Sequence, residues 1–160
     1  MTFSPKLTRG IAAIYMSEAL KEARMAYDKD EVPVGAVIVH NGRIIARAHN
    51  QIRLLKDPTA HAEMLAITQA AAHLKSERLL DCVVYATIEP CSMCAGALVL
   101  ARVKTLVYGA RDPKTGACGS VVNIVNHKKL NHRIKVKRGV LEKESALILR
   151  EFFSKKRKRK

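Results

Sequence analysis

Two short stretches of the sequence contain residue types that can hold a metal ion. The first is His61-Ala62-Glu63 and the second is Pro90-Cys91-Ser92-Met93-Cys94. Imidazole and thiolate both bind zinc, and three protein ligands leave the fourth position of a tetrahedral ion open for water, as in catalytic zinc sites. We therefore predict that His61, Cys91 and Cys94 together bind one zinc ion.

Glu63 is not needed as a ligand in this arrangement. Residues two apart on a regular helix point about 200° apart, so His61 and Glu63 can reach one site only if it lies off the N-terminal end of their helix. The segment Asp57-Pro58-Thr59 is typical of a helix start. Glu63 could then take a proton from a zinc-activated water and return it to a substrate.

His-x-Glu alone is weak evidence. Cys-x-x-Cys alone is a moderate signal, because it also occurs in redox motifs and structural zinc sites. A structural site usually has four protein ligands. Cys82 and Cys118 could supply the fourth, but both are better explained as buried small residues or loop thiols. Taken together, with a proline before Cys91, the two stretches resemble the signature of zinc deaminases that act on nucleobases.

The elements that must position these residues follow from the apolar pattern. Asn41-Gly42 between two β-branched runs predicts a hairpin. We expect loops over residues 50–58 and 110–120, whereas residues 121–126 could form a short helix or a strand. Helices are predicted over 11–29, 60–74, 91–102 and 142–153, and strands over 35–40, 43–49, 82–87, 105–109 and 133–138.

Strands that alternate with helices favour an α/β fold, in which helices cover both faces of a sheet. The length of 160 residues fits one domain. We predict a zinc-dependent deaminase domain over residues 1–153 and a basic C-terminal tail over residues 154–160.

The charge distribution indicates a polyanionic partner. The net charge is +15, and residues 113–141 contain no acidic side chain. The basic residues of this segment and of the chain end are Lys114, Lys128, Lys129, Arg133, Lys135, Lys137, Arg138 and residues 155–160. Two such blocks favour nucleic acid, although the last block could simply be a solubilising tail. No stretch is apolar enough for a membrane span or a signal peptide, so we expect a cytoplasmic protein.

Several further segments resemble the bacterial-type tRNA-specific adenosine deaminases of the cytidine deaminase-like superfamily. The resemblance extends from about Ile14 to Phe153. It is carried by residues 31–37, Asn50, 57–63, 87–97, 109–117, 131–133 and 152–153. The chain departs from the family pattern at Ser92, at Cys118 and in its more basic end.

This resemblance implies a three-layer α/β/α fold around a mixed five-stranded sheet. It also implies hydrolytic deamination of adenosine to inosine at the wobble position of a tRNA anticodon, with one Zn²⁺ per subunit of a homodimer. The partner would be the anticodon stem-loop, whose target nucleotide must leave its stack to reach the site.

The resemblance further implies roles for individual residues. Glu63 would protonate N1 of adenine and then the leaving amine. Asn50 would bond the base or its sugar, the Ala62 backbone would contact the base, and Val32 and Pro33 would help to form the pocket wall. Contacts with ribose, phosphates and flanking nucleotides are expected from Asp112, Lys114, His127, Asn131 and Phe153.

Two other functions would use the same motifs. A deaminase of free cytosine, guanine or a nucleoside would share the zinc site, but a small neutral substrate needs no basic C-terminal third. A non-enzymatic, zinc-stabilised RNA-binding module would also share it, and its function would survive the change Glu63→Ala.

Overall fold

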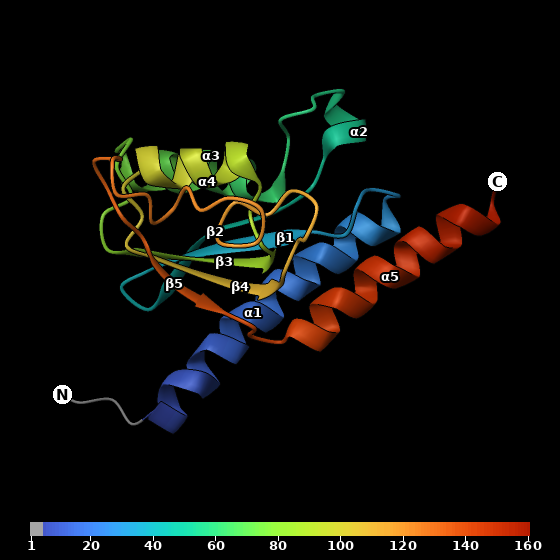
Figure 1. The fold of residues 1–160 in the computed structure, drawn as a ribbon, viewed down its shortest axis with the longest axis horizontal. Coiled ribbons are helices and arrows are strands. Elements are labelled where there is room, and N and C mark those ends of the chain that lie inside the picture. The colour runs from blue at the N-terminus through green and yellow to red at the C-terminus, as the bar shows by residue number, and fades with distance from the viewer. Residues whose placement is uncertain (1–4) are drawn as a thin grey trace.

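The computed structural model describes residues 5–160, whose five strands form one mixed sheet in the order β2-β1-β3-β4-β5 (Figure 1). Strand β1 is antiparallel to both β2 and β3, whereas β3, β4 and β5 run parallel. The strands are β1 (Gly35–His40), β2 (Arg43–His49), β3 (Cys82–Ile88), β4 (Thr105–Ala110) and β5 (Lys135–Arg138).

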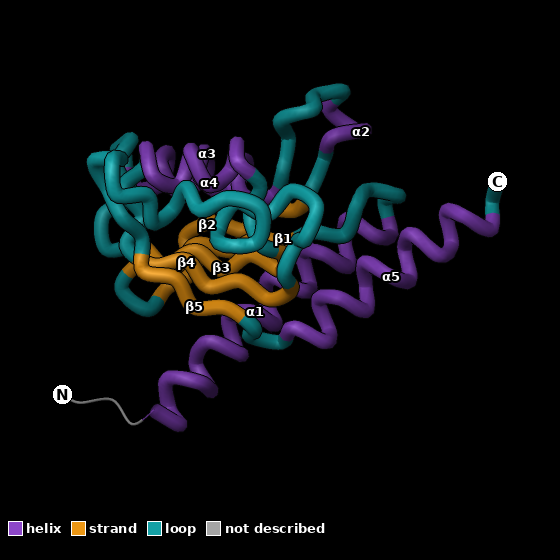
Figure 2. The backbone as a smooth tube through the Cα atoms, in the orientation of Figure 1, coloured by secondary structure: helices purple, strands orange, loops and turns teal. Residues whose placement is uncertain are grey.

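Helices cover both faces of this sheet, which confirms the predicted three layers (Figures 1 and 2). Helices α1 (Pro5–Asp28) and α5 (Glu142–Lys158) lie on one face, where α1 packs on β1 and β3 and α5 on β4. Helices α3 (Ala62–Leu74) and α4 (Ser92–Leu100) lie on the other. Because side chains alternate along a strand, Ile38 packs beneath α3 and α4, and its neighbour Val37 packs beneath α1.

The hairpin predicted at Asn41-Gly42 joins β1 to β2. Both residues have positive φ, 49° and 73°, as the tight turns that join twisted antiparallel strands require. The turn is also held from outside, because the Tyr15 hydroxyl donates a 2.9 Å hydrogen bond to the Gly42 carbonyl.

The structure differs from the sequence prediction in two loops. The predicted loop over residues 50–58 contains a one-turn helix, α2 (Ile52–Leu55). Its amides at Arg53 and Leu54 donate to the buried Glu31 carboxylate over 3.2 and 2.8 Å. The segment 121–126 is neither of the predicted alternatives but a loop, tied by an isolated bridge between Cys118 and Asn123.

Several elements have different ends from those predicted; α3 begins two residues late and α4 ends two residues early. Helix α1 begins at Pro5, six residues early, and β5 begins two residues late. Helix α5 continues five residues past its predicted end, to Lys158, and Lys156 Nζ bonds Asp30 Oδ2 over 2.9 Å. The division at 153/154 stays a prediction and falls inside this helix, and residues 1–4 of the predicted domain lie outside the described residues. None of the helices within residues 5–160 has the length and apolar character to cross a membrane.

Candidate active site

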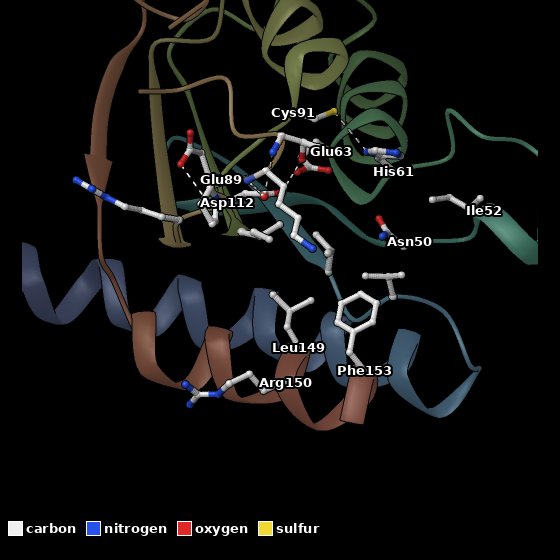
Figure 3. A pocket seen from close by; sticks show the side chains of 17 residues that line it. Asn50, Ile52, His61, Glu63, Glu89, Cys91, Asp112, Leu149, Arg150 and Phe153 are labelled. Atoms are coloured by element: carbon white, nitrogen blue, oxygen red, sulfur yellow. Dashed lines mark hydrogen bonds between the residues drawn. The ribbon is translucent and has the colours of Figure 1, made fainter. Parts of the chain in front are cut away.

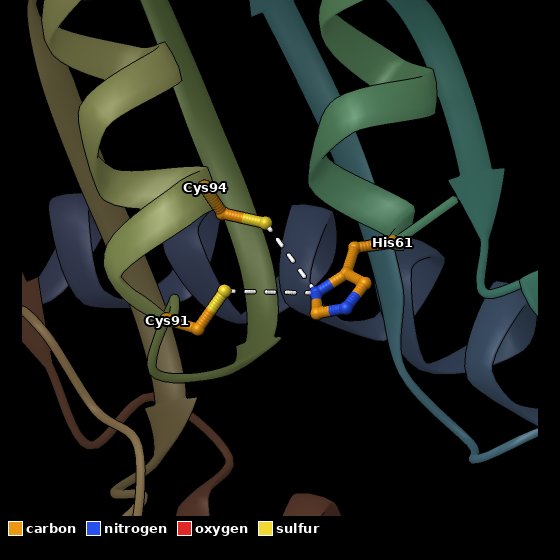
Figure 4. A group of neighbouring side chains, drawn as sticks. All are labelled: His61, Cys91 and Cys94. Atoms are coloured by element: carbon orange, nitrogen blue, oxygen red, sulfur yellow. Dashed lines mark hydrogen bonds between the residues drawn. The ribbon is translucent and has the colours of Figure 1, made fainter. Parts of the chain in front are cut away.

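Two helices begin at the same place and bring the predicted ligands together (Figure 4). His61 is the N-cap of α3, and Cys91 is the N-cap of α4. Both have extended backbone angles, and neither side chain makes a capping hydrogen bond. The side chains are therefore free to turn toward each other, and the positive ends of both helix dipoles favour thiolate there.

The distances among the three side chains fit a zinc ion. His61 Nδ1 lies 3.7 Å from Cys91 Sγ and 3.6 Å from Cys94 Sγ. A tetrahedral zinc with ordinary bond lengths separates its nitrogen and sulfur ligands by roughly 3.6 Å. Among residues 10–160, the cluster contains these three side chains and neither Cys82 nor Cys118. The three predicted ligands are thus placed as a three-ligand zinc site requires, and neither of the other two cysteines is positioned as a fourth ligand.

The two thiols of the cluster have opposite pKa shifts. Hydrogen bonding with Cys94 and His61 lowers the pKa of Cys91 to about 4. The pKa of Cys94 is raised, first by its hydrogen bond with Cys91 and then by burial. One thiolate is thus favoured before any metal binds, and a bound zinc ion would favour the thiolate form of the second as well.

Glu63 is buried in the first turn of α3, with Oε2 3.6 Å from Cys94 Sγ. Burial is the main cause that raises the pKa of its carboxyl group. His61 and Glu63 reach the same site because His61 precedes the regular helix instead of lying within it. The carboxyl group therefore lies beside the ligands without being one of them, in a setting suited to proton transfer.

A cavity of about 630 Å³ opens beside the cluster (Figure 3), a usual volume for a small-molecule site. Its wall is formed by residues just before β1, the N-terminal end of α3, the loop after β4 and one face of α5. The lining residues are Val32, Val34, Asn50, Ile52, His61, Glu63, Ile88, Glu89, Cys91, Arg111, Asp112, Pro113, Lys114, Thr115, Leu149, Arg150 and Phe153.

Most residues predicted to contact substrate lie at this cavity. Val32, Asn50, Lys114 and Phe153 line it, and Phe153 is 44% exposed. Pro33 is buried next to Val32 and Ala62 is buried behind the cavity wall. The Ala62 amide already donates a 2.8 Å hydrogen bond to Asn50 Oδ1.

Asp112 lines the cavity but directs its carboxylate into its own loop. The carboxylate accepts hydrogen bonds from the amides of Lys114 and Thr115 over 3.0 and 3.1 Å, and from the Thr115 hydroxyl over 2.6 Å. This pattern is an Asx turn, which shapes a loop without any ligand. Asp112 thus holds the segment on which Lys114 reaches the cavity.

Two predicted contact residues are not brought to the cavity. Asn131 Oδ1 accepts a hydrogen bond from Arg102, just beyond the C-terminal end of α4, and His127 Nδ1 accepts one from the Lys129 amide. The ligands are at the other end of α4, roughly 14 Å away for nine residues. Contacts of Asn131 and His127 with RNA stay predictions.

Sequence reasoning did not assign a role to several lining residues. Leu149 and Arg150 lie four and three residues before Phe153 on α5, a spacing that places all three on one helix face. From this spacing, the sequence could have indicated that Leu149 and Arg150 lie on the same helix face as Phe153. Glu89 is buried at the end of β3 and bonds the loop after β4. Its only sequence signal is an acidic residue directly after an apolar strand.

A sheet between two helix layers, with these ligands at converging helix starts, defines a zinc deaminase of the nucleobase-acting class. The model of the MafB19-like deaminase family matches residues 12–157, so the chain belongs to this family. It is 50% identical over 147 residues to the tRNA-specific adenosine deaminase of Bacillus subtilis, which covers 92% of this chain and 91% of that protein. The corresponding enzyme of Aquifex aeolicus is 50% identical over 143 residues, with 89% and 94% covered.

Comparison with solved structures also places the chain among the deaminases. A structure from studies of A-to-I editing by tRNA deaminases at the wobble position has a TM-score of 0.83 at 48% identity, covering 85% of this chain and 99% of that chain. A guanine deaminase from Nitrosomonas europaea has a TM-score of 0.78 at 26% identity, with 96% and 94% covered. The cytidine deaminase-like fold predicted from the sequence is therefore confirmed, and the higher identity lies with the tRNA deaminases.

Proposed function

We propose that this protein deaminates adenosine to inosine at the wobble position of a tRNA anticodon. One observation carries the proposal: the chain is 50% identical to tRNA-specific adenosine deaminases over about nine-tenths of its length. The residues required for the chemistry lie within that length. His61, Cys91 and Cys94 form the metal cluster, and Glu63 lies beside it.

The metal ligands and Glu63 have separate roles in the reaction. A zinc ion held by the three ligands would lower the pKa of a water molecule and so supply the nucleophile for C6 of adenine. Glu63 would accept a proton from that water and deliver it to N1. It would then accept the proton of the new C6 hydroxyl and pass it to the departing amine, so that water and adenosine become inosine and ammonia. Burial of the carboxyl group raises its pKa and suits it to both accepting and donating protons.

The cavity suits a base that has left its stack. Asn50 Oδ1 is occupied by the Ala62 amide, which leaves the Asn50 amide nitrogen as the donor toward a base or sugar. Val32 supplies an apolar wall and Phe153 an aromatic face at the opening. Lys114 would bind a phosphate, and the anticodon stem-loop is the part of tRNA that we expect to bind. The proposal also includes the substrate contacts that were predicted for Pro33, Ala62, Asp112, His127 and Asn131.

Helix α4 supports a homodimer. A helix that is apolar on all sides is normally buried on all sides, and residues 92–100 contain no charged side chain. Yet Leu100 is 77% exposed on the outer layer of the molecule. We propose that a second copy of the chain covers this helix.

A cytoplasmic location completes the proposal. None of the four cysteines forms a disulfide in the structure, as expected in a reducing compartment. A tRNA substrate belongs in the same compartment.

The deciding experiment offers the purified protein an anticodon stem-loop RNA, free adenosine, guanine and cytosine, and measures inosine, xanthine and uracil. We expect inosine in the RNA only. Turnover of free bases alone would reject the proposal. The variant Glu63→Ala should bind the RNA with unchanged Kd and lose turnover by at least about a hundredfold, a usual contribution of general acid–base catalysis. Retained turnover would reject the assigned mechanism.

A further inference from the structure

The cavity wall contains a buried carboxylate that the chemistry above does not use. Glu89 is 1% exposed and lies between the end of β3 and Cys91. Among the residues that the structure describes, no lysine, arginine or histidine forms an ion pair with it. A buried carboxylate without a cation is costly unless hydrogen-bond donors surround it.

The loop after β4 supplies those donors. Glu89 Oε2 accepts hydrogen bonds from the amides of Cys118 and Ser120, each over 3.1 Å. Oε1 accepts one from the Ser120 hydroxyl over 2.5 Å and one from the Asp112 amide over 3.3 Å. All the donors come from residues 112–120, so this single side chain fixes both ends of the loop.

The loop also fits closely around the carboxylate. A Cβ atom added to Gly116 would lie 2.3 Å from Glu89 Oε2 and 2.5 Å from the Asp112 carbonyl, so only glycine leaves room there. The Ala117 amide donates to the Pro90 carbonyl over 2.9 Å, and Gly116 forms an isolated bridge with Cys91. The loop and the ligand segment therefore form one packed unit.

We propose that Glu89 is a positioning residue for substrate binding. It holds the wall formed by residues 111–115 at a fixed distance from Cys91, and so sets where Lys114 stands relative to the reacting base. The proposal rests on the proposed function above. A carboxylate suits this role because three backbone amides donate to it, whereas a glutamine would turn its own N–H groups toward at least one of those amides.

The test is Glu89→Gln, which keeps the size of the side chain. Buried donors left without an acceptor weaken the loop, so KM for the anticodon stem-loop should rise about tenfold or more. We expect kcat within about threefold of the parent value, because Glu63 and the ligands are untouched. Zinc content should stay at one per chain, and hydrogen exchange at the Cys118 and Ser120 amides should become faster.

Two further variants test the proposal, and the milder of them, Ser120→Ala, keeps it testable if Glu89→Gln does not fold. Ser120→Ala removes one donor and should raise KM by less than Glu89→Gln does. Gly116→Ala should push the carboxylate away from the loop and raise KM. As a matched control, Glu22→Gln removes a largely buried carboxylate that bonds His49 outside the cavity, and it should leave KM unchanged.

An unchanged KM in the folded variants, or a loss of zinc as the main effect, would overturn the positioning role. Failure of the proposed function would look different, because the parent protein itself would make no inosine in RNA. In that case the hydrogen-exchange measurement still decides whether Glu89 fixes the loop.

Discussion

Asn50 Oδ1 accepts a hydrogen bond from the Ala62 amide, 2.8 Å away, at the N-terminus of the helix that carries Glu63. The N-cap residue of this helix, His61, makes no capping bond with its own side chain. Asn50, directly after β2, thus supplies the missing cap, and the His61 side chain is free to face the two cysteines. A residue predicted to bind substrate also holds the metal ligand in place.

The two roles of Asn50 can be separated by mutation. Asn50→Ala leaves the Ala62 amide without its acceptor, which costs about 1–2 kcal/mol and lowers Tm by about 2–4 °C per kcal/mol. Asn50→Asp keeps an oxygen at the same helix N-terminus, where negative charge is favourable, but loses the amide nitrogen that would donate to the base. Thermal unfolding and kcat/KM on stem-loop RNA measure both effects.

We expect Asn50→Asp to unfold within a few degrees of the parent protein and to lose activity by about tenfold or more. Asn50→Ala should lose both stability and activity. If Asn50→Asp kept full activity, Asn50 would act as a helix cap and make no donor contact with substrate.

Removal of the metal should abolish deamination. A chelator strong enough to take zinc from two thiolates and an imidazole leaves Glu63 without an activated water, so activity should fall by more than about a hundredfold. Re-addition of one equivalent of Zn²⁺ should restore it. Metal content per chain, measured beside activity, checks the correlation, and full activity at zero metal would contradict the zinc assignment.

The substitution Cys91→Ser tests the same zinc assignment by removing one ligand instead of the metal. The serine hydroxyl is a poor zinc ligand, so the variant should lose metal even without a chelator. Cys82→Ser serves as the control, since Cys82 is buried in β3 and lies outside the ligand cluster. That variant should keep its zinc and differ in stability alone.

The sequence was sufficient to predict the ligand set, because each ligand lies in a short motif at a helix start. Other features depend on contacts between residues far apart in the chain. Helix α2 is fixed by Glu31, more than 20 residues before it, and the end of α5 is tied by Lys156 to Asp30, 126 residues away. No local periodicity reports such contacts. The hydrogen bond from Arg102 to Asn131 Oδ1, between residues 29 apart, is a contact of the same kind.

The dimer proposal predicts that Leu100→Glu gives a monomer. A charge at a position now 77% exposed costs little in the isolated chain, but within an interface it would be buried without a partner. Sedimentation or light scattering across a concentration series measures the mass. Leu80→Glu is the control, because Leu80 is also exposed, at 56%, and lies outside α4. A dimer that survives Leu100→Glu would place the interface elsewhere.

The basic residues at the end of α5 and just beyond it fall into two groups, those paired with an acidic side chain and those without such a partner. Lys156 and Arg159 lie 2.9 and 3.7 Å from Asp30, whereas no acidic partner within the described residues pairs with Arg157, Lys158 or Lys160. If the end binds RNA, glutamine at these three positions should weaken binding and reduce the salt slope by about 2, at about 0.7 per lost phosphate contact. Lys156→Gln should instead loosen the helix end. An unchanged slope after the triple change would show that the charged end does not contact RNA.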